Sequence, residues 1–156
     1  MPRGLAEPSV SMIIPNHNGA ATLAACLEAA CAEAGPGDEV IVVDDGSTDG
    51  SVDVIRRFPC TLVELGRRRG AAAARNAGAA RARGDVLFFI DADCVLPPGT
   101  LEKARRALAE HGGWPARGGR VAVGGTYTLR PYDPGFFSAF QSAFVHHFET
   151  KWREPD

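Results

Sequence analysis

Two aspartates separated by one alanine, Asp91 and Asp93, directly follow the apolar run at residues 86–90. Consecutive Val, Leu, Phe and Ile residues are typical of a central parallel strand that is covered on both faces. If the extended backbone continues past Ile90, both carboxylates point to the same side. Neighbouring carboxylates repel each other unless a cation lies between them, and hard divalent cations prefer carboxylate oxygens. The pattern therefore predicts a metal site, although a solvated strand end with ordinary turn acids is the simpler alternative.

Polar residues also follow two earlier predicted strands. Residues 10–15 form an apolar run that ends at Pro15, which we expect to stop the strand because proline cannot donate to a central ladder. Asn16 follows it, and residues 39–43 lead in the same way into Asp44 and Asp45. Apolar residues at helical spacing occupy the segments between the strands.

The alternation of strands and helices predicts an α/β fold with a doubly wound, mostly parallel sheet and helices on both faces. Further strands are expected at 60–65 and 121–129, and helices at 20–34, 52–58, 71–83, 101–111 and 136–148. Ligands of such sheets bind beyond the carboxyl ends of the strands. The polar segments that follow the strands should therefore converge on one crevice.

The composition limits the classes of protein to consider. The 156 residues, 45% hydrophobic and 23% charged, suit a single domain spanning residues 1–156. A net charge of −2 gives no general attraction for nucleic acid, and residues 67–69 are too short an arginine run to provide one. The four cysteines form no Cys-x-x-Cys pair and predict reduced core thiols in a cytosolic protein.

The sequence contains no apolar segment of the kind that targets or anchors a protein. The first eight residues lack the hydrophobic stretch of a signal peptide, and no run approaches the roughly 18 apolar residues of a membrane span. We expect a cytoplasmic protein, and a peripheral association with a membrane is left open.

With these segments in place, the sequence resembles the nucleotide-binding portion of family 2 glycosyltransferases of the GT-A fold. The resemblance covers the chain to about residue 125 and rests on four motifs in order. They are Ile13-Ile-Pro-Asn-His-Asn18, Val42-Val-Asp-Asp-Gly-Ser-Thr-Asp49, Gly70-Ala-Ala-Ala-Ala-Arg-Asn-Ala-Gly78 and Gly84-Asp-Val-Leu-Phe-Phe-Ile-Asp-Ala-Asp93. Each motif alone is weak, whereas the ordered set is specific.

The resemblance implies a role for each of these positions. Asp44, with Asp45 beside it, would bind the base of a nucleotide-diphosphate sugar, typically a UDP-sugar, in a pocket lined by Pro15 and Asn16. Arg75 would lie against the base or diphosphate, Asp91 would face the ribose and the metal, and Asp93 of the DXD motif would ligate Mg²⁺ or Mn²⁺. The metal would neutralise the diphosphate that leaves during direct, inverting displacement.

The sequence departs from the family after this point. Family members supply a general base from a later acidic motif, and residues 129–156 hold neither a Glu-Asp pair nor a Gln-x-x-Arg-Trp segment. Asp133 and Glu149 lie there without a marked context, so the catalytic base stays unknown. We therefore expect a donor domain that lacks most of the acceptor-binding part. The alternative is a non-catalytic or partner-dependent module that binds the nucleotide sugar.

Other residues favour structural interpretations. His17 and the pair His146 and His147 lack metal-binding spacing, and residues 67–69 are interpreted as a solvated loop, with phosphate contact as the lesser option. The phenylalanines from Phe136 to Phe148 form an apolar stripe that would serve as core or as a contact with a partner chain or a second copy. A dehydrogenase or nucleotidyltransferase is disfavoured because no glycine-rich loop follows the first strand.

Overall fold

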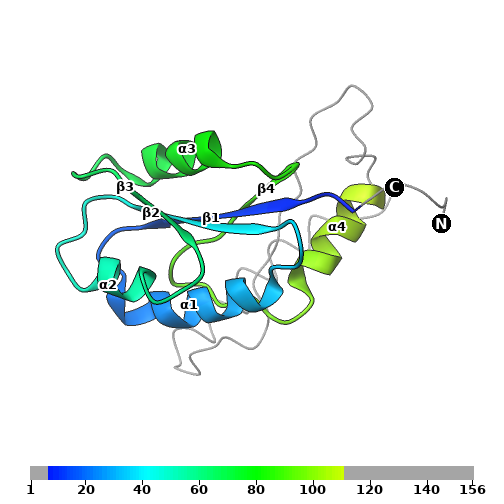
Figure 1. Ribbon diagram of the computed structural model, residues 1–156, viewed down its shortest axis with the longest axis horizontal. Coiled ribbons are helices and arrows are strands. Elements are labelled where there is room, and N and C mark those ends of the chain that lie inside the picture. Colours follow the sequence, from blue (N-terminus) through cyan, green and yellow to red (C-terminus); the bar gives the residue numbers. More distant parts are fainter. Residues whose placement is uncertain (1–6, 111–156) are drawn as a thin grey trace, which may run out of the picture. The chain divides into compact units, whose positions relative to one another are not determined.

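The computed structural model describes residues 7–110, all within the first of the two units into which the chain divides, residues 1–117. The elements in chain order are β1 (Val10–Asn16), α1 (Ala20–Glu33), β2 (Glu39–Asp44), α2 (Ser51–Ile55), β3 (Thr61–Glu64), α3 (Ala71–Arg81), β4 (Val86–Phe89) and α4 (Thr100–Glu110). The strands form one parallel sheet in the order β3-β2-β1-β4 (Figure 1). The expected doubly wound α/β architecture is confirmed, and the expected elements beyond residue 110 lie outside the described part.

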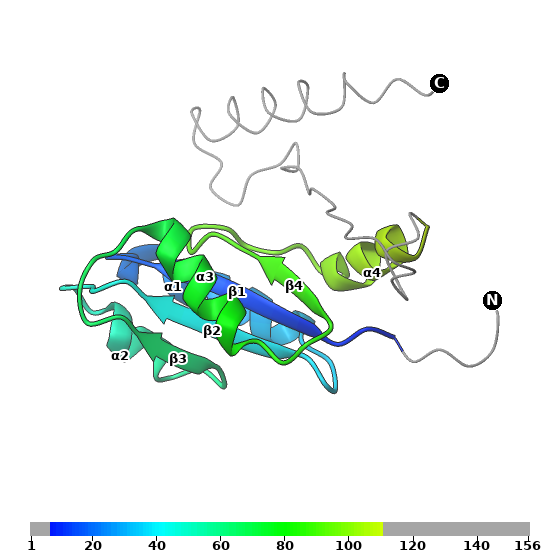
Figure 2. The same cartoon turned by 90° about the horizontal axis from the view of Figure 1, so that it is seen from above.

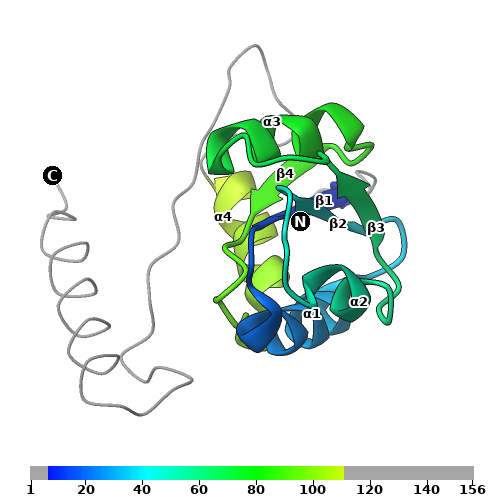
Figure 3. The same ribbon diagram turned by 90° about the vertical axis from the view of Figure 1, so that its left-hand side faces the viewer.

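Helices cover both faces of the sheet, with α3 on one side and α1 and α2 on the other (Figure 3). Alternate residues of β1 and β2 face opposite sides because strand side chains have a period of two. Met12 and Val42 pack in the larger core against α1, where Leu23 and Leu27 are fully buried. Ile41 packs in the smaller core beneath α3. The strict alternation of buried apolar residues thus places one helix layer on each side.

Helix α3 lies unusually close to the sheet at Gly78. A Cβ atom at this position would stand 2.4 Å from Ile13 Cγ2 and 3.1 Å from Val43 Cγ2, so any side chain would push the helix outward. Ala74, one turn earlier, is fully buried on the same face. Small residues therefore set the distance between α3 and the strands, and this distance fixes the position of the start of the helix.

The structure corrects the expectation that residues 86–90 form a strand covered on both faces. Among the described residues β4 lies at the edge of the sheet and pairs with β1 alone. Leu87 and Phe89 are 43% and 47% exposed, and β4 lies beside α3 rather than beneath it (Figure 2). An apolar run does not distinguish a strand buried on both faces from an edge strand, because both carry the same residue types.

A second correction concerns Pro15, which lies within β1 instead of ending it. Pro15 pairs in register with Val43, and the strand continues to Asn16. Ile13 O accepts a hydrogen bond from Ile90 N on the β4 side, and Pro15, two residues later, faces the same neighbour. Since β4 ends at Phe89, no ladder hydrogen bond is lost where proline has no N–H.

A largely buried ion pair anchors α4 at the opposite end of the sheet. Asp38 accepts two hydrogen bonds from Arg105 Nη2, at 2.6 and 2.8 Å, and its side chain is fully buried. Val10 N and Gly35 N donate to the same carboxylate at 2.9 Å each.

No helix in residues 7–110 has both the length and the apolar character needed to cross a lipid bilayer.

Candidate functional site

The loops that follow β1 and β2 are joined by side-chain hydrogen bonds. Asn16 Nδ2 donates to Asp44 Oδ1 at 3.0 Å and to Ser47 Oγ at 3.1 Å, while Asn18 N donates to Ser47 Oγ at 2.9 Å. Asn16 is 2% exposed, and its Oδ1 is a buried acceptor that no donor within the described residues reaches. The expected convergence of these two polar segments is therefore observed, and hydrogen bonds maintain it.

The neighbouring aspartates Asp44 and Asp45 are each 3% exposed but have different partners. Asp44 accepts a hydrogen bond from Asn16 Nδ2 of β1 and, at 2.9 Å, one from Ser47 N within its own turn. Asp45 accepts from Arg69 N at 2.6 Å and from Gly70 N at 2.7 Å. Asp45 thereby attaches the loop at residues 66–70 to the end of β2 and fixes the start of α3.

Gly46 allows this loop to lie directly against the turn after β2. Its φ is +70°, a left-handed conformation that favours glycine. A Cβ atom at Gly46 would stand 2.6 Å from both Arg67 C and Arg68 N, which are backbone atoms and cannot move aside cheaply. The Asp-Asp-Gly sequence is therefore suited to holding the loop at residues 66–70, called the arginine loop below. Asp45 binds the backbone of this loop, and Gly46 leaves room for it.

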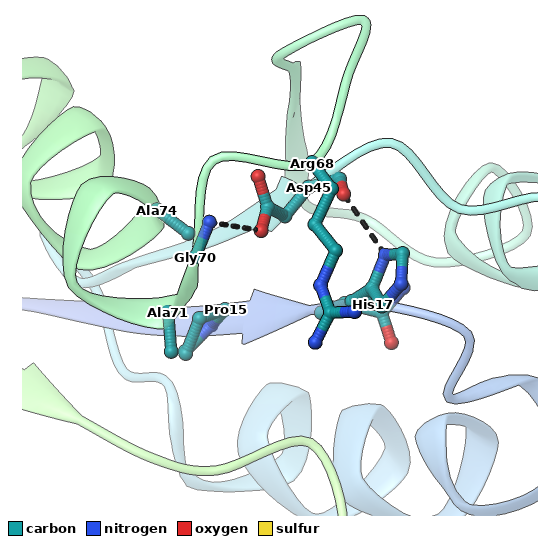
Figure 4. A pocket seen from close by; sticks show the side chains of 8 residues that line it. Pro15, His17, Asp45, Arg68, Gly70, Ala71 and Ala74 are labelled. Carbon is teal, nitrogen blue, oxygen red and sulfur yellow. Dashed lines mark hydrogen bonds between the residues drawn. The ribbon is translucent and has the colours of Figure 1, made fainter.

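A hollow of about 130 Å³ lies where these segments meet (Figure 4). It is lined by Pro15, Asn16, His17, Asp45, Arg68, Gly70, Ala71 and Ala74. The residues come from the end of β1 and the residue that follows it, the turn after β2, the loop at residues 66–70 and the first turn of α3. The volume is below the roughly 300–1,000 Å³ typical of complete small-molecule pockets, so this hollow suits one part of a larger ligand.

The structure brings together only some of the predicted base-binding residues. Pro15, Asn16 and Asp45 line the hollow, whereas Asp44 is not among its lining residues. His17 and Arg68, for which the sequence favoured structural roles, do line it. His17 Nδ1 is 2.9 Å from Asp45 O, and Figure 4 shows the Arg68 side chain extending toward the imidazole. A signal for His17 existed in the sequence, because it directly follows Pro15 and Asn16.

Asp91 and Asp93 lie in a turn rather than on an extended strand. Strand β4 ends at Phe89, and Cys94 N donates to Asp91 O at 2.9 Å, which closes the turn. Cys26 Sγ of α1 also approaches Asp91 O, at 3.6 Å. Burial raises the pKa of the Cys26 thiol to about 12, and nearby Cys94 contributes, so Cys26 holds the turn as a neutral donor. The predicted strand alternation of the two carboxylates therefore does not apply.

The two carboxylates have different electrostatic partners. Arg75 Nη2 of α3 is 2.5 Å from Asp91 Oδ1, with side chains that are 36% and 56% exposed. Asp93 Oδ1 is contacted by the Cys94 thiol at 3.7 Å, and within residues 7–110 the structure shows no cation paired with Asp93. Helix α3 thus links the hollow to the turn that carries Asp91 and Asp93, called the acidic turn below. Ala71 and Ala74 line the hollow, and Arg75 reaches the acidic turn.

This donor set suits a divalent cation that is held only partly by the protein. Carboxylate oxygens are the ligands that Mg²⁺ and Mn²⁺ prefer, and Asp93 offers an exposed carboxylate. The described residues contain no group of three acidic, histidine or cysteine side chains arranged to enclose a metal. A cation at Asp93 would therefore take most of its ligands from water and from a bound anion such as a diphosphate.

Comparison with known proteins gives a family match. The model of "Glycosyl transferase family 2" matches residues 11–152. An uncharacterized glycosyltransferase of Haemophilus influenzae is 33% identical over 131 residues, covering 80% of this chain and 45% of its own length. An undecaprenyl-phosphate 4-deoxy-4-formamido-L-arabinose transferase of Pseudomonas syringae is 38% identical over 112 residues, covering 66% of this chain and 33% of its own.

Solved structures show the same fold. The mannosyltransferase PcManGT of Pyrobaculum calidifontis, in complex with GDP-Man and Mn²⁺, has a TM-score of 0.63 at 35% identity, covering 67% of this chain and 33% of its own. S. aureus TarS 1-349 in complex with UDP-GlcNAc has a TM-score of 0.61 at 26% identity, covering 66% and 32%. The expected GT-A type of fold is thereby confirmed. The chain spans a third to under half of the length of these relatives.

Proposed function

The chain belongs to glycosyl transferase family 2, and from this premise we propose that it binds the nucleotide-diphosphate sugar donor of a glycosyl transfer reaction. One observation carries the proposal: α3 connects a hollow suited to a base with an acidic turn suited to a metal-bound diphosphate. Ala71 and Ala74 line the first, and Arg75 contacts Asp91 in the second. Relatives solved in complex with UDP-GlcNAc or with GDP-Man and Mn²⁺ support the same class of ligand.

In this proposal the hollow receives the nucleotide base. His17 provides an aromatic ring, and Arg68 and Asp45 provide a donor and an acceptor at its wall. The two Asp45 oxygens already accept from Arg69 N and Gly70 N, but each carboxylate oxygen can accept more than one hydrogen bond. Asp44 has an indirect role in this proposal, because its hydrogen bonds hold Asn16 and the turn at Ser47 in place.

The diphosphate in turn lies toward Asp91 and Asp93. A Mg²⁺ or Mn²⁺ ion held by Asp93, with Asp91 nearby, would neutralise the negative charge that develops on the diphosphate as the bond to the sugar breaks. The residues of this chain position the donor: the hollow holds the base, and Arg75 supplies a permanent positive charge beside the leaving group. Direct displacement with inversion also needs a base for the acceptor hydroxyl, and the sequence marks no residue for that role.

A second candidate function is a donor-binding module that depends on a partner chain for transfer. It is favoured by the phenylalanines between Phe136 and Phe148, whose helical spacing predicts an apolar stripe. The stripe from Phe136 to Phe148, outside the described residues, is the proposed contact for a partner or a second copy. Sugar transfer to any acceptor by the purified chain alone would exclude this candidate.

Thermal unfolding with nucleotides tests the proposal. At about 100 times the dissociation constant, UDP or GDP with Mn²⁺ should raise Tm on the order of 10 °C. Asp93→Ala should abolish the metal-dependent part of the shift, whereas Asp53→Ala, at an exposed position of α2, should retain it. The absence of a shift with every nucleoside diphosphate, with either metal, would refute donor binding.

A further inference from the structure

The ion pair between Arg75 and Asp91 places a permanent cation on one of the two carboxylates of the acidic turn. Arg75 Nη2 lies 2.5 Å from Asp91 Oδ1. Within residues 7–110, Asp91 is the acidic side chain that Arg75 contacts, and Asp93 has the neutral Cys94 thiol as its neighbour. The turn therefore presents one neutralised and one free carboxylate to an arriving metal ion.

We propose that Arg75 makes metal binding depend on the nucleotide: it competes with the metal at Asp91 until a diphosphate provides it with another partner. This inference rests on the proposed function, because the released guanidinium requires an anion at the same place. In the empty site a divalent ion meets a single free carboxylate and a neighbouring positive charge. Once the diphosphate is bound, its oxygens serve both the metal and Arg75.

The chemistry of arginine suits such an exchange. A guanidinium does not lose its proton in proteins, so a metal must displace it rather than deprotonate it. Its planar set of donors fits carboxylate and phosphate equally well. The pair is partly exposed, with side-chain exposures of 36% and 56%, and pairs of this kind are weak enough to be exchanged. Arg75 can therefore leave Asp91 without destabilising the fold.

The packing of α3 does not depend on this ion pair. Ala74 and Gly78 of the helix are buried against Ile13, Ile41 and Val43 of the central strands, away from the exposed turn. Arg75 projects from the same helix toward β4 and reaches the residue two positions after that strand. The fold therefore does not need the ion pair to hold α3 in place, and the positive charge of Arg75 is available for a role at the turn.

Metal titrations of the 156-residue chain test the proposal directly. Mn²⁺ alone, followed by the EPR signal of the free ion, should bind Arg75→Gln about three to ten times more tightly than the parent chain, because both the competing pair and the repelling charge are removed. UDP with saturating Mn²⁺ should bind the same variant about tenfold or more weakly, since a charge-assisted contact to phosphate is lost. A merely structural residue would not produce two effects of opposite sign.

Matched variants separate charge from shape. Arg81→Gln removes the same charge from an exposed position on the last turn of α3 and should leave both affinities within about twofold. Arg75→Lys keeps the charge, so its affinity for Mn²⁺ alone should stay near that of the parent chain. Arg75→Met provides a second uncharged variant if Arg75→Gln does not fold, as judged by circular dichroism.

Two results would overturn the inference while leaving donor binding intact. The first is UDP·Mn²⁺ binding by the parent chain with no gain in affinity for Mn²⁺ alone in either uncharged variant. The second is Mn²⁺ binding by the parent chain that is equally tight with and without UDP. Failure of the parent chain to bind any nucleoside diphosphate would instead refute the proposed function, and the inference with it.

Discussion

The attachment of the arginine loop by Asp45 gives a prediction that links stability to the site. Asp45→Asn keeps the size of the side chain but removes its charge and replaces one acceptor oxygen with an NH₂ donor. The present carboxylate accepts from Arg69 N at 2.6 Å and from Gly70 N at 2.7 Å, and the residue is 3% exposed. One of these N–H groups would then face a donor, and the other would keep a weaker, neutral hydrogen bond.

The expected cost follows from these two contacts. A hydrogen bond to a charged group contributes about 1.5–3 kcal/mol, and a neutral one about 1 kcal/mol. Losing one charged bond and weakening the other should lower the free energy of unfolding by about 2–4 kcal/mol. Because the loop carries Arg68 and leads into the helix turn at Ala71, the hollow should also lose its shape, and UDP should bind more weakly.

Urea unfolding and amide hydrogen exchange measure the two parts of this prediction. The variant should unfold at lower urea with an unchanged slope, and the amides of Arg69 and Gly70 should exchange faster in the native state. Asp53→Asn, at an exposed carboxylate on α2, serves as the matched control and should stay within about 0.5 kcal/mol of the parent chain. Weakened UDP binding with unchanged stability and unchanged exchange would show that Asp45 serves the ligand alone, and the reasoning would fail.

Two further predictions concern the scaffold. Gly78→Ala places a Cβ atom 2.4 Å from Ile13 Cγ2 and should lower the free energy of unfolding by about 1–3 kcal/mol. Gly50→Ala, at a position with open space around it and a φ of −76°, should change stability little. Equal urea midpoints for the two variants would contradict this. Burial acts to raise the pKa of Asp38, but hydrogen bonds from Arg105 and backbone N–H groups outweigh it and hold the pKa below the ordinary 3.8. The stabilisation by ionised Asp38 is therefore complete above about pH 4 and is lost as the pH falls through the lowered pKa. Asp38→Ala should lower the free energy of unfolding by about 3 kcal/mol at pH 7 and make it fall less steeply below about pH 4. An equally steep fall in the variant would contradict the lowered pKa of Asp38.

The sequence predicted the order of strands and helices well because hydrophobic periodicity reports local structure directly. Leu23, Cys26, Leu27 and Ala30 recur at helical spacing and are all buried in α1. The placement of strands in the sheet is a non-local property, and the prediction of it was wrong for the strand at residues 86–90. The run at residues 86–90 has the composition of a central strand, yet β4 lies at the edge of the described sheet with Leu87 and Phe89 exposed.

By itself, the sequence determined that the polar segments after β1, β2 and β4 belong to one edge of a parallel sheet, since the carboxyl ends of parallel strands share that edge. Only the tertiary structure decided what each side chain does there. Asp45 rather than Asp44 borders the hollow, because the left-handed turn at Gly46 lets the arginine loop lie against it. Arg75 forms an ion pair with Asp91, because α3 packs closely enough at Gly78 to bring the guanidinium to the turn.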